Sequence, residues 1–252
     1  MKKKFWIEMT GIFFLAGLLS CQQDVKETRL MSYNVKNGQG MNGFADYGRT
    51  ANVILKEKPN VVALQELDSA TMRSKGAYVL GELAQRTGMH ATYAPAIDFD
   101  GGKYGIGILS KERPLNICSK ALPGREEART MLITEFKDYI YVCMHLSLTE
   151  EDRMASLPII REALSGFHKP VFIAGDWNDT PESALLQEIE KDFTILTDTA
   201  SPTYPADQPD STLDYIAAYR PSIHIKESKG YVTEATSESD HRPVTVVIKW
   251  TE

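Results

Sequence analysis

Apolar runs typical of buried β-strands alternate along the chain with segments of helical periodicity. The apolar runs predict strands over residues 30–35, 61–65, 107–110, 131–136, 140–144, 171–174, 213–217 and 244–249. The helical segments predict helices over residues 47–56, 77–87, 150–167 and 181–190. No repeat, low-complexity tract or linker divides residues 29–252, so we predict a single domain there. Near-continuous apolar strands interleaved with helices indicate an α/β sandwich with buried sheets.

Capping residues and prolines predict where two of these helices begin and where one is interrupted. Thr149 and Asp152 have the spacing of a capping box at the start of the third helix. Pro158 lies inside that segment and is expected to kink or split the helix, because proline lacks the backbone N–H. Thr180 and Pro181 are expected to be the N-cap and the first helical residue of the fourth helix.

Residues 1–20 have the organisation of a secretory leader. Lysines precede the apolar segment 12–19, which is too short to span a bilayer. The leader ends in Leu18-Leu19-Ser20-Cys21, which resembles the bacterial lipobox, whose cysteine becomes acylated. We therefore expect a lipoprotein anchored to a membrane through Cys21 on the extracytoplasmic side (periplasm or cell surface), with residues 21–28 as a tether. The alternative is an ordinary signal peptide with an incidental cysteine.

The charge balance argues against a long polyanionic partner. The 28 basic and 34 acidic residues give a net charge of −6. Removing the three lysines and one glutamate of residues 1–20 leaves 25 basic and 33 acidic residues, a net charge of −8. Broad nucleic-acid binding depends on contacts of Lys and Arg with phosphate, which this composition disfavours. A small phosphate-bearing substrate stays compatible, because a bound metal ion supplies positive charge.

Two cysteines follow the leader, Cys118 and Cys143, and no Cys/His spacing in the sequence indicates a zinc site. Cys143 lies within the apolar run 140–144. We expect two buried thiols. A disulfide between them, which an extracytoplasmic location permits, is the alternative.

Polar residues stand where several of the predicted strands end. They are Asn34, Glu66, His145, Asp176 and Asn178, and the pair Asp240-His241 precedes the last predicted strand. Open α/β sheets bind ligands where their strands end. Hard oxygen ligands of this kind suit Mg²⁺ or Mn²⁺, and a histidine with an aspartate in reach supplies an oriented acid–base group.

The serial order of these motifs resembles the endonuclease/exonuclease/phosphatase superfamily, which includes DNase-I-like nucleases, neutral sphingomyelinases and inositol polyphosphate 5-phosphatases. The matching segments are Ser32-Tyr-Asn34, Gln65-Glu66, Gly107-Ile-Leu-Ser110, Glu127-Ala-Arg129, Met144-His145-Leu146, Gly175-Asp-Trp-Asn178, Leu213-Asp214-Tyr-Ile216 and Ser239-Asp-His241. Residues 94–104 and 202–207 further resemble a bacterial subgroup of small metal-dependent hydrolases. The resemblance spans residue 29 to the C-terminus. It implies the DNase-I-like fold, a four-layer α/β sandwich of two packed mixed β-sheets flanked by helices.

The resemblance also implies a metal centre that binds Mg²⁺ or Mn²⁺. Glu66 is implied as the main metal ligand, assisted by Asn34 and Asp240. Asp176 is implied either to orient or deprotonate the attacking water or to hold a second metal ion.

Further residues are implied to act on the phosphoryl group. Asn178 is expected to contact its oxygens and to orient Asp176. His241, held by Asp214, is implied as a general acid–base group or a stabiliser of developing charge. The expected ligands of the non-bridging oxygens are His145 and Arg129, with Tyr104 as a nearby donor.

These roles predict a monomeric, metal-dependent hydrolase of phosphate esters, either a phosphodiesterase or a phosphatase. The substrate classes left open are small molecules, lipid head groups and nucleic acids. One alternative is a nuclease acting on DNA or RNA, and another is a non-catalytic ligand-binding lipoprotein on the same scaffold. Four charged residues near the expected cleft, Asp68, Arg73, Asp98 and Asp100, are interpreted as solvated loop charges.

Overall fold

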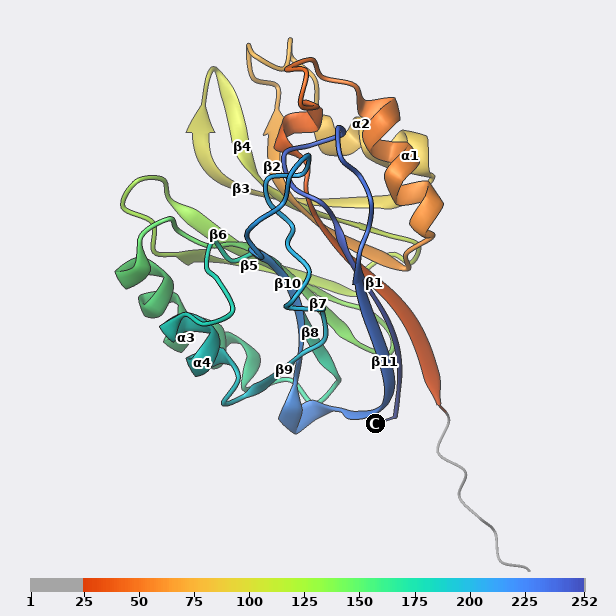
Figure 1. Cartoon of the computed structure of the whole chain (residues 1–252), viewed down its shortest axis with the longest axis vertical. Helices are drawn as coiled ribbons and strands as arrows, with labels where there is room; N and C mark the ends of the chain where they lie inside the picture. The colour runs from red at the N-terminus through yellow and green to blue at the C-terminus, as the bar shows by residue number, and fades with distance from the viewer. Residues whose placement is uncertain (1–24, 252) are drawn as a thin grey trace, which may run out of the picture.

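Two β-sheets packed face to face form the centre of the computed structural model, which describes residues 25–251 (Figure 1). The first sheet consists of β1 (Lys26–Asn34), β2 (Val61–Ser69), β3 (His90–Phe99), β4 (Gly102–Ser110), β11 (His224–Val232) and β12 (Val244–Thr251). The second consists of β5 (Asn116–Leu122), β6 (Arg129–Glu135), β7 (Ile140–His145), β8 (Val171–Asp176), β9 (Phe193–Ile195) and β10 (Asp214–Tyr219). Their orders are β11-β12-β1-β2-β4-β3 and β5-β6-β7-β8-β10-β9.

Helices cover the outer face of each sheet, so the molecule has four layers (Figure 1). The first sheet is covered by α1 (Tyr47–Glu57) and α2 (Val79–Thr87), and the second by α3 (Glu150–Leu164) and α4 (Ala184–Ile189). Short 3-10 turns, η1 (Lys36–Gly38) and η2 (Arg220–Ser222), follow β1 and β10. The predicted four-layer α/β sandwich with two mixed sheets is therefore confirmed.

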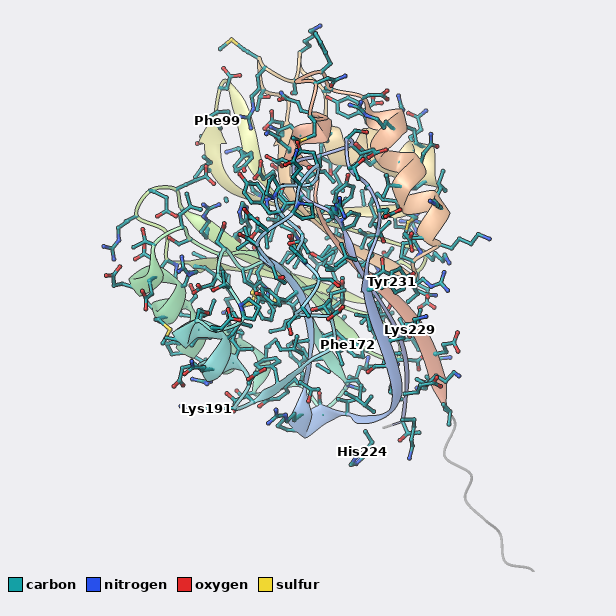
Figure 2. The ribbon with its side chains drawn as sticks, in the orientation of Figure 1. Phe99, Phe172, Lys191, His224, Lys229 and Tyr231 are labelled. Carbon is teal, nitrogen blue, oxygen red and sulfur yellow. The ribbon has the colours of Figure 1, made fainter. Side chains whose placement is uncertain are left out.

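Apolar side chains on both faces of the interior strands explain their near-continuous apolar sequences. Successive side chains of a strand point to opposite faces of its sheet. In β1, Leu30 therefore joins the core between the sheets, whereas Met31 packs in the cluster beneath α1 and α2. Phe172 of β8 lies in the inter-sheet core (Figure 2), and its neighbour Ile173 packs in the cluster beneath α3 and α4.

Strand direction gathers the chemistry at one end of the sandwich. β1 is parallel to β2, and β7 is parallel to β8, so these four strands end at the same side of their sheets. β10 is antiparallel to β8, and β12 is antiparallel to β1, so both begin where their neighbours end. The segments before β10 and β12 therefore meet the ends of β1, β2, β7 and β8.

The eight predicted strands are the eight interior strands, and the four that the sequence pattern missed are the sheet edges β3, β5, β9 and β11. The six residues 116–121 of β5 are all exposed, and in β11 no residue is fully buried. Edge strands bury fewer side chains, so their sequences lack the apolar run that identifies an interior strand.

Several predicted boundaries are wrong. Residues 26–28, assigned to the tether, pair with β12 as the first part of β1. α4 begins at Ala184, three residues after Pro181, and its N-cap is Ser183 and not Thr180. Pro158 does not split α3, which runs unbroken to Leu164.

The capping box predicted at α3 does not form. Thr149 is the N-cap residue, but its side chain makes no cap hydrogen bond. Its hydroxyl donates to Glu126 Oε2 (3.2 Å) instead. Asp152 accepts from the backbone N–H of Arg125 (2.7 Å). Contacts with residues outside the helix have replaced the reciprocal bonds.

The two thiols lie in different surroundings. Cys143 is buried in β7, where burial raises the pKa of its thiol to about 12. Cys118 lies on the edge strand β5 and is exposed, so the prediction that both thiols are buried is wrong for Cys118. Both are free cysteines, so no disulfide joins them. Within residues 25–251, no helix has the length and apolarity to cross a membrane.

Candidate active site

Asp176 stands at the centre of the polar cluster where the strands end. It is the last residue of β8 and pairs in register with His145, the last residue of β7, and with Asp214, the first residue of β10. Asn34, the last residue of β1, reaches across from the first sheet and donates from Nδ2 to Asp176 Oδ2 (3.0 Å). The carboxylate is buried, so the two sheets together hold it in a fixed position.

Glu66 is brought into this cluster by a β-bulge. The register between β2 and β4 shifts between Leu64 and Leu67. Glu66 has a φ of 58°, in the left-handed region that residues other than glycine seldom occupy. Such strain costs on the order of 1–3 kcal/mol and is found mainly at functional sites. The bulge re-aims the side chain, and Asn34 Nδ2 donates to Glu66 Oε1 (2.9 Å).

The segment before β12 supplies Asp240 and His241. Ser239 fixes this segment to the end of β1, because its buried hydroxyl donates to the carbonyl oxygen of Asn34 (2.7 Å). Asp240 Oδ2 accepts from Lys36 Nζ at 2.6 Å. Burial raises the pKa of Glu66, the hydrogen bond from Asn34 opposes this, and the negative charge of Asp240 adds to the rise.

His241 has a carboxylate on each side. Its Nδ1 is 2.8 Å from Asp214 Oδ2, and its Nε2 is 3.6 Å from Asp176 Oδ2. Burial alone lowers the pKa of His241, but the charges of Asp214 and Asp176 outweigh it and raise the pKa to about 10. The imidazole is therefore protonated at neutral pH, and its Nδ1–H donates to Asp214.

His145 flanks Asp176 on the other side, with Nε2 3.6 Å from Asp176 Oδ2. Its Nδ1 is 3.3 Å from Arg129 Nη1, and a guanidinium only donates, so Nδ1 accepts and the proton sits on Nε2. Burial lowers the pKa of His145 to about 4, the charge of Asp176 opposes this, and the charge of Arg129 adds to the lowering. His145 is therefore a neutral donor at Nε2.

Asn178 stabilises the turn after β8. It has a φ of 52°. Its backbone N–H donates to Asp176 Oδ1 (3.0 Å), and its Nδ2 donates to the carbonyl oxygen of Leu146 (2.9 Å). The predicted orientation of Asp176 by Asn178 therefore has a structural basis in the backbone bond.

A cavity of about 410 Å³ opens above this cluster. Eight of the ten predicted site residues line it: Tyr104, Arg129, His145, Asp176, Asn178, His241, Glu66 and Asp240. The other two, Asn34 and Asp214, are fully buried behind that lining. A larger hollow of about 530 Å³ beside α1 has Arg49 and Glu238 in its lining but no histidine.

Comparison with known proteins identifies the fold and the family. Residues 31–241 match the sequence model of the Endonuclease/Exonuclease/phosphatase family. The chain belongs to the endonuclease/exonuclease/phosphatase family. A search of curated protein sequences found no match.

Solved structures of low sequence identity share this family fold. An endonuclease/exonuclease/phosphatase from Bacteroides vulgatus has a TM-score of 0.70 at 17% identity, covering 90% of this chain and 100% of its own. The mannosyl-6-phosphatase of Bacteroides thetaiotaomicron has a TM-score of 0.67 at 17% identity, covering 88% and 99%. The human Nocturnin catalytic domain with bound sulfate has a TM-score of 0.64 at 16% identity, covering 91% and 97%.

Members of the endonuclease/exonuclease/phosphatase family are phosphoester hydrolases that generally depend on divalent metal ions. The donor set of this chain fits such an ion. Glu66, Asp240 and Asp176 line the same cavity. The charges of Asp240 and Asp176 raise the pKa of Glu66, and a bound cation would relieve this mutual repulsion. One oxygen or nitrogen each from Asp176, Asp214 and His241 also lie within 4.8 Å of one another. Because Asp214 and His241 already form a hydrogen bond with each other, we interpret this second group as an acid–base unit.

Several residues that line or border the site had no predicted role in it. Glu127 and Leu213 line the cavity and stand in two of the matching segments, but no role was assigned to either. Lys36, Leu148 and Tyr204 were not predicted at all. Lys36 follows the Ser32–Asn34 motif by two residues, and Tyr204 lies in the segment 202–207 that supported the resemblance, so both had a signal in the sequence.

The prediction of a solvated loop charge is wrong for Asp68. Asp68 is buried on β2, and its two oxygens accept from Arg73 Nε and Nη2, both at 2.7 Å. The Arg73 guanidinium stacks on the ring of Phe99, 4.4 Å from its centroid. Phe99 is the last residue of β3, at the β3–β4 hairpin (Figure 2). Asp100 accepts from the backbone N–H of Arg73 (2.6 Å). Asp98 and Arg73 are both exposed, as expected, although these contacts hold the Arg73 side chain in place.

Proposed function

We propose that this chain is a Mg²⁺- or Mn²⁺-dependent hydrolase of phosphate esters, acting as a phosphodiesterase or a phosphatase. The observation that carries the proposal is the buried Asp176 carboxylate, with a histidine 3.6 Å away on each side. Glu66 and Asp240 lie at the same cavity. The proposed active form is a monomer.

Glu66 and Asp240 are the proposed ligands of the metal ion. A bound divalent ion neutralises charge on the phosphoryl oxygens and lowers the pKa of a bound water. The amide nitrogen of Asn34 donates to Glu66 and Asp176, so Asn34 positions both carboxylates. Direct binding of the metal ion by the Asn34 side-chain oxygen stays a prediction.

Asp176 and the side chains around it carry out the proton transfers and stabilise the phosphoryl oxygens in this proposal. Asp176 accepts a proton from the attacking water as that water adds to phosphorus. His145 donates from Nε2 and Arg129 adds positive charge, so both stabilise the non-bridging oxygens. His241 carries a proton at Nε2 that it can donate to the departing ester oxygen, and Asp214 stabilises the imidazolium from behind. Tyr104 lines the same cavity as a further donor.

The experiment is hydrolysis of a panel of phosphate esters with Mg²⁺, with Mn²⁺ and with EDTA. The panel covers sugar phosphates, nucleotides, inositol phosphates, phospholipids, DNA and RNA. We expect EDTA-sensitive turnover that falls by at least about 10²-fold in Glu66→Ala and His241→Ala. Glu227→Ala, an exposed carboxylate on β11, is the matched control. Turnover restricted to DNA or RNA would favour the nuclease alternative, and tight binding without turnover in Mn²⁺ would favour a binding protein.

We further propose that Cys21 is lipidated and holds the domain on the extracytoplasmic face of a membrane. β1 runs from Lys26 to the site at Asn34, nine residues or about 27 Å (Figure 1). The chain from Cys21 to Lys26 spans at most about 18 Å, so it is too short to turn the site end toward the anchoring membrane. The proposed substrate is therefore a diffusible phosphate ester. Cys21→Ser should move the protein from the membrane to the soluble fraction, and unchanged membrane retention would contradict the anchor.

A further inference from the structure

Two exposed apolar side chains stand on the lining of the otherwise charged cavity. Leu148, after β7, is 66% exposed, and Tyr204, before β10, is 37% exposed. Leu213 lines the same cavity and is half-buried. Apolar side chains left in water at a binding cavity usually mark a surface that a ligand covers.

The backbone holds both residues in place. The Leu148 N–H donates to Glu126 Oε1 (2.7 Å), and its carbonyl oxygen accepts from Arg153 Nη1 (2.7 Å). The Tyr204 N–H donates to the carbonyl oxygen of Ser211 (2.9 Å), and its own carbonyl oxygen accepts from the N–H of Ser211 (2.9 Å). The exposure of these side chains is therefore a fixed feature of the rim.

The Tyr204 ring also has a defined relation to the acid–base unit. Its centroid is 4.8 Å from that of the His241 imidazole, with the ring planes at 45°. A ligand whose phosphoryl group lies beside His241 therefore places its organic part within reach of Tyr204. The proposed phosphoryl chemistry uses charged and hydrogen-bonding groups and leaves the tyrosine ring and the leucine side chain without a role.

We propose that Tyr204 and Leu148 form a subsite for a ring-bearing substituent of the phosphate ester, a cyclic group with an apolar face. This inference rests on the proposed function and adds the substrate class to it. Flat or chair-like rings stack on tyrosine and remove apolar area from water, which favours binding. Short acyclic substituents such as ethyl or glycerol leave that area in water. Tyr204 and Leu148 are specificity residues in this proposal, because they touch the substituent and not the reacting atoms.

The test compares benzyl phosphonate with ethyl phosphonate, two non-hydrolysable ligands that share the anionic group and differ in the ring. Binding to the Mn²⁺-loaded full chain is measured by calorimetry, so the readout does not require turnover. We expect benzyl phosphonate to bind at least about 10-fold more tightly than ethyl phosphonate. Tyr204→Ala should reduce that ratio to about one, Leu148→Ala should reduce it partly, and Tyr204→Phe should keep it.

Leu115→Ala is the matched control, because Leu115 is 63% exposed and does not line the cavity. This variant should keep the wild-type ratio. Equal binding of the two phosphonates by the wild type, or a ratio that survives Tyr204→Ala, would overturn the subsite. A failure of hydrolysis with every ester, together with a retained ring preference in binding, would reject the proposed function and leave the subsite standing.

Natural rings are then compared as phosphate esters. Glucose 6-phosphate presents a sugar ring, adenosine 5′-monophosphate presents a sugar and a base, and glycerol phosphate presents neither. A higher kcat/KM for glucose 6-phosphate than for glycerol phosphate would indicate a sugar ring as the recognised group. A gain confined to the nucleotide would indicate a base. No gain for either ring over glycerol phosphate would contradict the proposed substrate class.

Discussion

His145 and His241 occupy opposite sides of Asp176 at the same distance but in opposite electrostatic surroundings. Each places Nε2 3.6 Å from Asp176 Oδ2, and both rings are buried. Behind His241 stands the carboxylate of Asp214, whereas behind His145 stands the guanidinium of Arg129. The pKa is raised to about 10 in His241 and lowered to about 4 in His145.

The difference shows that the group behind a histidine sets its role more than its distance from the central carboxylate does. Strand order determines which group stands there. Asp214 begins β10, which is hydrogen-bonded to β8, and Arg129 begins β6, which is hydrogen-bonded to β7. Asp176 therefore has a charged proton donor, His241, on one side and a neutral donor, His145, on the other.

The largest expected effect is on proton affinity. In the metal-free protein, an NMR titration of the imidazole Cε1–H signals should give a pKa near 10 for His241 and near 4 for His145. Asp214→Asn removes the charge that raises the pKa of His241, so this pKa should fall, while that of His145 should change little. Two histidines that both titrate near the ordinary value of about 6.5 would remove the basis of the comparison.

A second test compares what each ring contributes to turnover, starting with His241. His241→Gln removes the proton donor and should lower kcat by about 10²–10⁴-fold, the usual contribution of general acid–base catalysis. Asp214→Asn should lower kcat within the same range, because His241 loses the partner that fixes its tautomer. If Asp214→Asn left kcat unaltered while His241→Gln abolished it, the pairing would have no catalytic role.

Sequence patterns identified the interior strands and missed the edges for a physical reason. Interior strands such as β8 bury both faces, so their residues are apolar in succession. The edge strand β5 exposes residues 116–121, and an exposed stretch carries no such run. An apolar run in the sequence therefore predicts a strand only where both faces of that strand are buried.

The candidate site was predictable to the extent that its residues stand at the ends of interior strands. Asn34, His145 and Asp176 are the last residues of β1, β7 and β8, as the sequence pattern indicated. The bulge at Glu66, the contact of Lys36 with Asp240 and the approach of Tyr204 to His241 depend on long-range packing. A local sequence pattern does not encode such contacts, because the residues that meet are far apart in the chain. Lys36 and Asp240, for example, are 204 residues apart.

His145 should contribute less than His241 if it acts as a neutral donor. His145→Ala removes one hydrogen bond to a developing oxyanion and should lower kcat by about 10²–10³-fold. His145→Asn keeps a donor and should recover part of this loss, whereas an amide at position 241 cannot replace an acid. Comparable rescue by Asn at both positions would show that the two histidines do the same work, which would contradict the assignment.

The smallest expected effect concerns the support of Arg129. Glu126 lies 3.5 Å from Arg129 and accepts from the Ser147 hydroxyl and the Leu148 N–H, both at 2.7 Å. Burial raises the pKa of Glu126, but these hydrogen bonds and the charge of Arg129 outweigh it and lower the pKa to about 2. Glu126 is largely exposed, so solvent screens these interactions, and Glu126→Gln should reduce the free energy of unfolding by only about 0.5–1 kcal/mol at pH 7.

The pH dependence of this loss of unfolding free energy shows whether the charge or the packing of Glu126 is responsible. The unfolded protein binds the extra proton between the ordinary glutamate pKa and about 2, so the contribution of Glu126 is present near neutral pH and is lost as pH falls through this window. Urea unfolding of wild type and Glu126→Gln should therefore differ most at pH 7 and converge toward pH 2. A difference that stays constant with pH would mean that Glu126 supports Arg129 through packing and not through its charge.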